Sequence, residues 1–565
     1  MKNTAWGSVA IVLAVILGAG PILAQSTAET PKASTPATAL ALAAHMSDPV
    51  KRATADHSKF EILKQDFKSG PEVTAACLSC HTEASNQVMH SIHWKWEYEN
   101  PKTTQVLGKS KVLNSFCGNV ASNETRCTSC HAGYGWTDVR APMPDQPDRV
   151  DCLVCHDKSG QYTKQDNLSG NPPLEPVAAK AKTITGADAW AVNLAKAALS
   201  VGPPPGRENC GSCHFYGGGG DNVKHGDLSS ALIDPTPHVD VHMSKDGANF
   251  TCASCHVSDK HIFTGSRLNT NVTDPHADRK PGEARDVATC SSCHSDQPHS
   301  KVSVVGRKLN DHTDRVACQT CHIPDFAKGG VATKTLWDWS TAGQLKDGKP
   351  YSEEDFTQSN GKQLHTYLST KGNFAWGENV VPHYEWFDGT VRYTLPGETI
   401  DPSKTVTINS VEGSATDPKS RIFPFKLMEG RQAYDSKLNT LAYNHVYGPE
   451  TDTALWTNFD WSKSIKAGME YAGQPYSGEF GFVDTYMYWP ITHMVAPSNE
   501  ALKCESCHAV DGRMANLAGI YLPGSGPGIG GKLGLVLFLM TALGVGGHGM
   551  LRLIRGRKHG GADHG

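Results

Sequence analysis

The chain carries eight copies of the pattern Cys-x-x-Cys-His. The cysteines and histidines of these copies are Cys77, Cys80, His81, Cys127, Cys130, His131, Cys152, Cys155, His156, Cys210, Cys213, His214, Cys252, Cys255, His256, Cys290, Cys293, His294, Cys318, Cys321, His322, Cys504, Cys507 and His508. The pattern is the attachment signature of c-type haem, because two thiols add to the porphyrin vinyl groups and the histidine binds the iron. A zinc site would need cysteine pairs that meet, and gives no reason for a histidine after every pair. The sequence therefore predicts eight covalently bound haems.

The ligand on the other side of each iron decides between electron transfer and catalysis. A second histidine closes the site, whereas an open or weakly held position admits a substrate. Histidines in tails or linkers are expected to be poor ligands: His45, His57, His548, His559 and His564. Thirteen others remain: His90, His93, His225, His238, His242, His261, His276, His299, His312, His365, His383, His445 and His493. The preferred distal ligands are those near a haem motif: His93, His225, His242, His261, His299, His312 and His493.

One cysteine, Cys117, belongs to no motif, since 16 of the 17 cysteines are used by the eight copies. No second free cysteine is left for an intramolecular disulfide. An odd thiol in an exported protein is a candidate reactive group. The alternative is a small buried residue that only packs.

The remaining segments indicate an exported chain with one membrane anchor. Residues 1–24 resemble a signal peptide, and residues 25–70 form a linker and N-terminal segment. After a Gly/Pro-rich joint at 523–531, residues 532–555 form an apolar helix whose 19-residue uncharged core, Leu533–Leu551, would span about 28 Å. The basic tail 556–565 and the arginines before it place the C-terminus inside. We therefore expect the haem domain on the periplasmic face of a bacterial cytoplasmic membrane, with His548 a lone interfacial histidine or a contact for a quinone.

Residues 71–515 form the expected octahaem domain. With 38% hydrophobic residues, 55 Gly and 33 Pro, the chain has a modest aliphatic core, which packed porphyrins would complete. The predicted fold is mainly α with much irregular coil, organised around eight packed haems. The haem-free, aromatic-rich insertion 323–500 is expected to hold small β elements, such as Thr390–Leu395 and Thr405–Asn409. It either only covers the haems or also walls a substrate cavity. The net charge of −4 gives no sign of nucleic acid binding.

Several long strings in this chain resemble the octahaem tetrathionate reductase family of c-type cytochromes. They are His93–Tyr98, Phe116–Glu124, Asn209–Asp227, His312–Pro324 and Tyr488–Pro497, within a resemblance that covers roughly residues 70–515. The resemblance implies that seven haems are bis-histidine and that the second haem, at Cys127, Cys130 and His131, carries a lysine at a site open to substrate. The matching lysine is Lys224, and Cys117 corresponds to a cysteine beside that site.

Two functions remain open at this stage. The first is a membrane-anchored periplasmic reductase of tetrathionate or of small nitrogen compounds such as nitrite and hydroxylamine, supplied with electrons by a cytochrome or a membrane quinol dehydrogenase. Catalysis would then use Lys224, Cys117 and the haem of His131. The second is a non-catalytic electron conduit between a quinol-oxidising partner and another redox protein, a reading that the C-terminal anchor favours. A hydroxylamine-oxidising enzyme is a further variant, although no sequence string points to its haem-crosslinked tyrosine.

Overall fold

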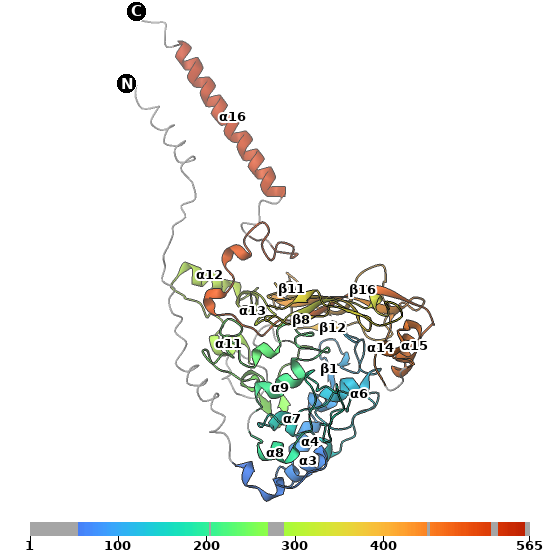
Figure 1. Ribbon diagram of the computed structural model, residues 1–565. Helices are drawn as coiled ribbons and strands as arrows, with labels where there is room; N and C mark the ends of the chain where they lie inside the picture. Colours follow the sequence, from blue (N-terminus) through green and yellow to red (C-terminus); the bar gives the residue numbers. More distant parts are fainter. Residues whose placement is uncertain are drawn as a thin grey trace, which may run out of the picture. The chain divides into compact units, whose positions relative to one another are not determined.

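The structure is a computed structural model that describes residues 55–202, 205–268, 270, 288–448, 452–520, 522 and 529–559 (Figure 1). The predicted signal peptide, the linker as far as residue 54, most of the 523–531 joint and His276 lie outside the described residues.

All eight haem motifs coincide with a helical turn or its end. Side chains three and four residues apart share one face of a helix, so a single turn directs both thiols and the histidine to one porphyrin. Threonine begins two of these turns as a helix cap, at Thr251 and Thr289. The motif helices are α3 (Gly70–Leu78), α6 (Glu124–Cys127), η4 (Thr128–Cys130), α7 (Leu153–His156), α9 (Arg207–His214), α10 (Cys252–Cys255), α11 (Cys290–His294), α13 (Cys318–His322) and η9 (Cys504–Ser506).

The helices between the motifs are also short, as expected for a chain wrapped around cofactors. The longest of these in the described haem domain is α15 (Trp461–Tyr471). The others are η2 (His57–Lys59), η3 (Glu61–Leu63), α4 (Ala84–Met89), α5 (Ile92–Lys95), η5 (Pro147–Arg149), α8 (Leu194–Leu199), η6 (Ser230–Leu232), α12 (Val304–His312), η7 (Trp339–Thr341), α14 (Leu455–Asn458) and η8 (Ser498–Glu500).

The insertion folds into a ten-stranded mixed sheet, so the expectation of only small β elements was wrong. Its strands are β5 (Thr333–Asp338), β6 (Ser352–Glu353), β9 (Tyr367–Leu368), β10 (Gly372–Gly377), β11 (His383–Phe387), β12 (Val391–Tyr393), β13 (Val406–Val411), β14 (Arg421–Asp435), β15 (Thr440–Leu441) and β16 (Phe480–Pro490). The main order is β12-β13-β16-β14-β5-β10-β9-β6, with β11 and β15 also paired to β14. Two-stranded ribbons add β1 (Glu97–Glu99) with β2 (Val106–Gly108), β3 (Ser258–Asp259) with β4 (Ile262–Phe263), and β7 (Phe356–Thr357) with β8 (Gln363–Leu364).

Strand β14 explains why sequence periodicity underestimated the sheet. It pairs with β16 from Phe425↔Pro490 to Asp435↔Phe480, and with β5 in parallel. Five consecutive residues from Ile422 to Lys426 are buried, because both faces of the strand are covered. A strand buried on both faces lacks the apolar–polar alternation that marks a half-exposed strand.

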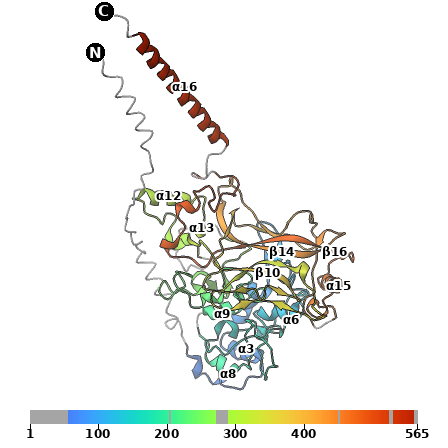
Figure 2. The ribbon, with the colours of Figure 1, turned by 45° about the horizontal axis from the view of Figure 1, so that its top comes forward.

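The sheet packs directly against segments near the second haem motif. Its buried side chains form one cluster with Phe116 and Val223, and Cys117 packs against the same cluster. Figures 1 and 2 show the sheet lying across one side of the group of helices that includes α6 and α9. The insertion thus returns onto the haem-binding part of the chain.

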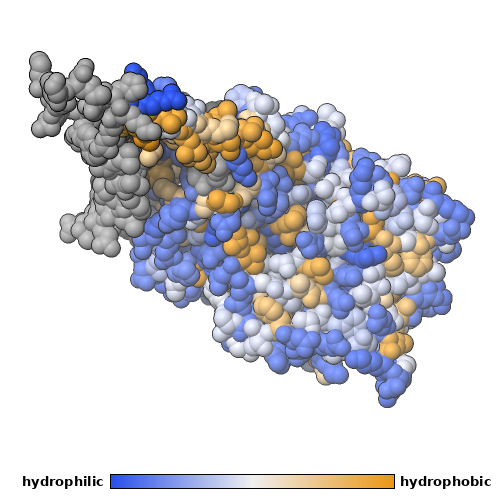
Figure 3. Space-filling model, turned by 90° about the horizontal axis from the view of Figure 1, so that it is seen from above, coloured by the Kyte–Doolittle hydropathy of each residue, from blue (hydrophilic) through white to orange (hydrophobic). Residues whose placement is uncertain are grey.

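The C-terminal helix α16 (Ile529–His559) is long and apolar. Its segment Ile529–Gly556 has a mean hydropathy of 1.8 over its most apolar window and no buried part, so its length and composition suit a membrane span. Figure 3 shows its side chains as a continuous orange strip.

Candidate haem sites and candidate active site

Seven of the eight motif histidines face another histidine at nearly constant distance. The ring centroids are 6.2 Å apart in His57–His81, 6.3 Å in His93–His214, 6.4 Å in His156–His261, 6.0 Å in His242–His294, 6.2 Å in His256–His493, 6.3 Å in His299–His322 and 6.0 Å in His312–His508. Metal–imidazole bonds are about 2 Å and each ring centre lies about 1 Å further, so two histidines on one iron place their centroids about 6 Å apart. The chain's own histidines thus fit seven bis-histidine haems.

Six of the seven preferred distal histidines occupy such pairs, and two assignments depart from the prediction. His57, set aside as a linker residue, lies opposite His81 because η2 returns to the first motif. His225 was chosen as a ligand but faces no motif histidine in the described residues. Its ring instead contacts the indole of Trp489 at 5.2 Å. Its neighbour in the chain, Lys224, lies near the cysteines of the second motif.

Thiols of different motifs lie close enough to interact, which orders the haems in space. Thiol–thiol hydrogen bonds join the first and third motifs (Cys77–Cys152), the second and fourth (Cys130–Cys213), the fourth and fifth (Cys210–Cys252), and the sixth and seventh (Cys290–Cys318). The charges of Cys155 and Cys213, of Cys255 and Cys293, and of Cys321 and Cys507 influence each other over a longer range. The motifs form one connected series, with the second as a branch from the fourth.

His131 of the second motif is the one motif histidine without a histidine ring opposite it in the described chain. It is fully buried among three tryptophans, with ring centroids 5.1 Å from Trp94, 5.4 Å from Trp96 and 4.7 Å from Trp136. Its Nε2 lies 2.7 Å from the Trp94 carbonyl oxygen. Burial lowers its pKa to about 3, so the ring is neutral. Because Nε2–H donates to this carbonyl, the lone pair lies on Nδ1, which is buried and has no hydrogen-bond partner.

A buried ion pair supports the backbone of His131. Lys164 Nζ lies 3.0 Å from an Asp151 carboxylate oxygen, and both side chains have at most 1% exposure. The same ammonium donates a hydrogen bond to the His131 carbonyl. Asp151 also accepts from the hydroxyls of Tyr134 at 2.9 Å and Tyr162 at 2.6 Å. This network of hydrogen bonds and one ion pair fixes the main chain of the second motif.

Lys224 lies beside the second motif, in the loop that follows α9. Burial lowers its pKa well below the ordinary value, as do the nearby charges of Arg267 and Lys109. The thiols of Cys127 and Cys130 are close enough to act on it in the opposite direction. A neutral amine has a free lone pair, so this environment prepares Lys224 to bind an iron held at the second motif.

The sheet of the insertion fixes the loop that carries Lys224. Lys426 on β14, with 1% exposure, donates hydrogen bonds to the carbonyls of Val223 at 2.8 Å and Lys224 at 3.1 Å. It also donates to Thr333 Oγ1 on β5 at 2.7 Å. Trp489 on β16 lies under the Lys224 ammonium, 5.2 Å from its ring centroid.

Cys117 also lies near the second motif. Asn114 Oδ1 accepts a hydrogen bond from the Cys117 backbone amide at 3.2 Å, so a tight turn holds the residue. Its thiol is near enough to Cys127 to contribute to that residue's raised pKa of about 12, which is due mainly to burial. It also acts on the ammonium groups of Lys334 and Lys371.

Several lysines lie around Lys224 and Cys117, and of these only Lys224 was identified from the sequence. Burial lowers the pKa of Lys334, Lys371 and Lys426, as it does for Lys224. The ammonium of Lys334 lies 3.2 Å from the ring centroid of Phe374, as a cation against an aromatic face. The sequence did contain one signal for these residues, namely a lone lysine inside an apolar run, such as Lys426. Burying an unpaired charge costs free energy, so a lysine at such a position usually has a role.

Two families and two proteins match the chain. Residues 334–511 match "Cytochrome c bacterial", and residues 251–323 match "Cytochrome c554 and c-prime". The crystal structure of octaheme cytochrome c from Shewanella oneidensis is 40% identical, covers 85% of this chain and 99% of its own, and superposes with a TM-score of 0.69. This chain belongs to the octahaem tetrathionate reductase family of c-type cytochromes. An uncharacterised protein of Archaeoglobus fulgidus is 24% identical over 257 residues, 38% of this chain and 82% of that protein.

The remaining described histidines of this octahaem cytochrome have other partners. His90 pairs with the Asn86 carbonyl at 2.7 Å and His445 with the Ser122 carbonyl at 2.5 Å. Three more lie against carboxylates: His238 with Glu500 at 2.6 Å, His365 with Glu354 at 3.0 Å and His383 with Glu385 at 2.8 Å. His548 lies on α16, away from any motif in sequence.

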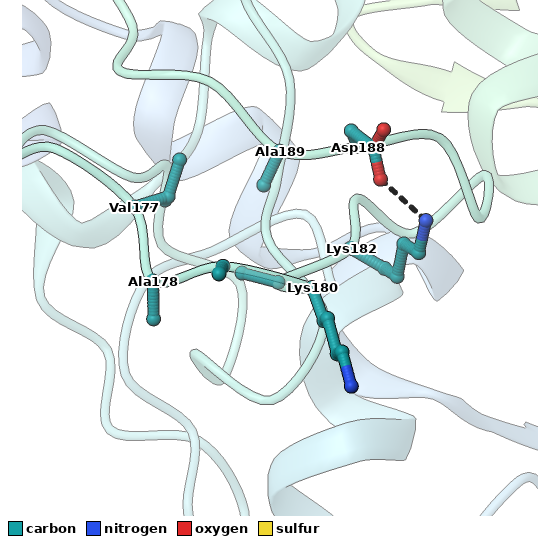
Figure 4. A pocket seen from close by; sticks show the side chains of 8 residues that line it. Val177, Ala178, Lys180, Lys182, Asp188 and Ala189 are labelled. Carbon is teal, nitrogen blue, oxygen red and sulfur yellow. Dashed lines mark hydrogen bonds and ion pairs between the residues drawn. The ribbon is translucent and has the colours of Figure 1, made fainter.

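A surface pocket offers no competing site. It is lined by Val177, Ala178, Ala179, Lys180, Ala181, Lys182, Asp188 and Ala189 (Figure 4). Lys182 and Asp188 neutralise each other across it. The lining holds no histidine, cysteine or aromatic group, so the second haem motif is the better candidate for chemistry.

Proposed function

We propose that this octahaem cytochrome is a periplasmic, membrane-anchored reductase of tetrathionate or of a small nitrogen compound such as nitrite or hydroxylamine. The proposed site is the second haem, held by Cys127, Cys130 and His131, with Lys224 as its distal ligand. The observation that carries the proposal is that His131 faces no histidine in the described chain, while a lysine with a lowered pKa lies beside its motif. The other seven haems form a bis-histidine electron relay.

The charge around the site suits a small anion. Arg267 and Lys109 lie near Lys224 and supply positive charge. Lys334 and Lys371 lie near Cys117, and because burial lowers their pKa their amines serve mainly as hydrogen-bonding groups. Positive groups in a water-poor region attract anions more strongly than the same groups do in bulk water. They would bind the substrate near Lys224, beside the second motif.

The haem iron, when bound, supplies electrons to the substrate. Tetrathionate takes up two electrons and its central S–S bond breaks to give two thiosulfates, with no net proton. Nitrite takes up six electrons and eight protons to give ammonium and two waters. Eight haems can hold either number of electrons. As a ligand of that iron, Lys224 would be displaceable by substrate, and its amine, once protonated, would donate a proton in the nitrogen reactions.

The sheet gives residues 323–500 a role beyond covering the haems. Lys426 and Trp489 come from β14 and β16, and both contact Lys224. Of the two readings of residues 323–500, the one in which the insertion also forms the substrate site is therefore favoured.

A stopped-flow experiment tests the proposal. The fully reduced protein is mixed with tetrathionate, nitrite or hydroxylamine, and haem reoxidation is followed. One compound is expected to reoxidise the haems rapidly, with a rate changed at least tenfold in Lys224→Ala and unchanged in Lys349→Ala, an exposed control. Slow reoxidation by all three compounds, unaffected by Lys224→Ala, would contradict the proposal.

The same result would support the second candidate, a non-catalytic conduit. The observation that favours it is α16, which would hold the protein beside membrane quinol dehydrogenases. A conduit needs eight closed haems and leaves Lys224 and Cys117 without a role. Reduced protein would then pass electrons to another exported redox protein rather than to a small molecule.

A further inference from the structure

The eighth haem motif and the start of the anchor converge on one cluster. Tyr384, Trp386, Ile422 and Met514 form its buried part. Packed against them are Cys507 of the eighth motif, Val316 just after α12, and Leu517, Ile520 and Leu522 of the chain that leads to α16. The polypeptide therefore leaves the haem domain next to the eighth haem.

The length of the connection limits how far this haem can lie from the membrane. Six residues separate Leu522 from Ile529, the first residue of α16, so seven Cα-to-Cα steps join them. An extended chain of that length reaches at most about 25 Å. If α16 spans the bilayer, the cluster that contains Cys507 stays close to the membrane surface.

The helix that supplies the other histidine of this pair ends in an exposed apolar tip. Helix α12 ends at His312, whose ring centroid lies 6.0 Å from that of His508. At its opposite end Val302, Val304 and Val305 are 90%, 60% and 61% exposed. Single exposed apolar residues are ordinary, but three within four positions on one protruding tip are not.

Hydrogen bonds fix the conformation of this tip. Ser303 Oγ caps α12 by accepting from the Gly306 amide at 2.9 Å. Arg307 donates from its guanidinium to the carbonyls of Lys301 at 3.3 Å and Val302 at 3.0 Å. A Cβ at Gly306 would lie 2.1 Å from the Ser300 carbonyl oxygen, so only glycine fits there. A preformed tip loses little conformational entropy when it binds a surface.

Basic residues flank the three valines. Lys301 precedes them, and Arg307 and Lys308 follow. The acidic residues nearby, Asp311 in the last turn of this helix and Asp314 just after it, lie at its other end, beside His312. Apolar side chains rimmed by cations are the combination that binds the interface of an anionic membrane.

We propose that the tip formed by residues 301–308 docks onto the lipid surface of the membrane that α16 spans. The valines enter the interface and the basic residues contact anionic headgroups. Helix and tip then give two attachments, which fix the orientation of the haem domain and hold the eighth haem toward the bilayer. The inference rests on the proposed membrane anchor.

Hydrogen–deuterium exchange of the full chain in lipid nanodiscs tests the docking. Backbone amides of residues 301–306 are expected to exchange at least tenfold more slowly in discs with phosphatidylglycerol than in non-ionic detergent. The variant Val302→Ser/Val304→Ser/Val305→Ser is expected to lose this protection. The control Val381→Ser, at another exposed valine, is expected to keep it.

The outcomes separate the docking from the anchor. If α16 is protected in the disc but residues 301–306 exchange as in detergent, the docking proposal is overturned while the anchor stands. If α16 itself does not enter the disc, the anchor fails, and the docking proposal fails with it. Protection of the tip that appears only after a membrane redox protein is added would assign the tip to a protein partner and also overturn the proposal.

Discussion

Replacement of Lys164 by methionine is predicted to destabilise the second haem site strongly. Lys164 and Asp151 form an ion pair with 1% and 0% exposure, and the lysine also holds the His131 carbonyl. Methionine keeps the length of the side chain but leaves the Asp151 carboxylate buried without its counter-charge. Breaking a buried pair in this way costs about 3–5 kcal/mol. Guanidinium denaturation followed by haem absorbance measures the loss.

An exposed ion pair from the same region provides the matched control. Lys182 and Asp188 make the same type of contact with 47% and 86% exposure, and Lys182→Met is expected to cost less than about 1 kcal/mol. Adding Asp151→Asn to Lys164→Met removes the stranded charge and keeps one acceptor oxygen for the tyrosine hydroxyls that now donate to the two carboxylate oxygens. The double variant should therefore recover part of the stability. If the free energy of unfolding of Lys164→Met lies within about 1 kcal/mol of that of the unsubstituted protein, the reasoning from burial is refuted.

Three further predictions concern ligands and substrate. His57→Ala is expected to convert one low-spin haem, the first, to a five-coordinate or water-bound form visible by EPR, whereas His90→Ala should leave all spectra unchanged. Because burial lowers the pKa of Lys224, its amine loses its proton more readily than an ordinary lysine does. Acidification through that pKa should protonate the amine and free one haem, and Lys224→Ala should lack this spectral transition. Arg267→Gln is expected to raise KM for an anionic substrate roughly tenfold, about 1.4 kcal/mol, with a smaller change in kcat; an unchanged KM would remove Arg267 from the substrate site.

The haem-binding residues could be predicted from sequence because covalent attachment needs a fixed local spacing. Distal ligands come from elsewhere in the chain, so proximity in sequence was an uncertain guide to them. It selected His93 and His493, whose rings lie opposite motif histidines, but set aside His57, whose ring lies opposite His81. It also placed His225 on an iron, although the fold turns that ring toward Trp489.

The sheet was underestimated for a different physical reason. Alternation of apolar and polar residues detects strands that have one solvent-exposed face. Strand β14 is instead buried on both faces from Ile422 to Lys426. Lys426 was missed with it, because a lysine within an apolar run gives no indication of which backbone carbonyls it will meet. The haem motifs thus define the cofactors, while the environment of the candidate active site depends on long-range packing.

Packing also explains how one haem can differ from the other seven within a single chain. Each bis-histidine pair needs only two imidazoles on opposite sides of a porphyrin. At the second motif, Lys426 binds the Lys224 carbonyl and Trp489 lies against the Lys224 side chain. In the proposed active site, this loop would place Lys224 where the other sites place a histidine. A lysine amine can be protonated and released more readily than a neutral imidazole, because its intrinsic pKa is about four units higher. In that proposal the insertion would supply what an open haem requires, a replaceable ligand positioned by rigid strands, and Arg267 and Lys109 near Lys224 would attract an anion.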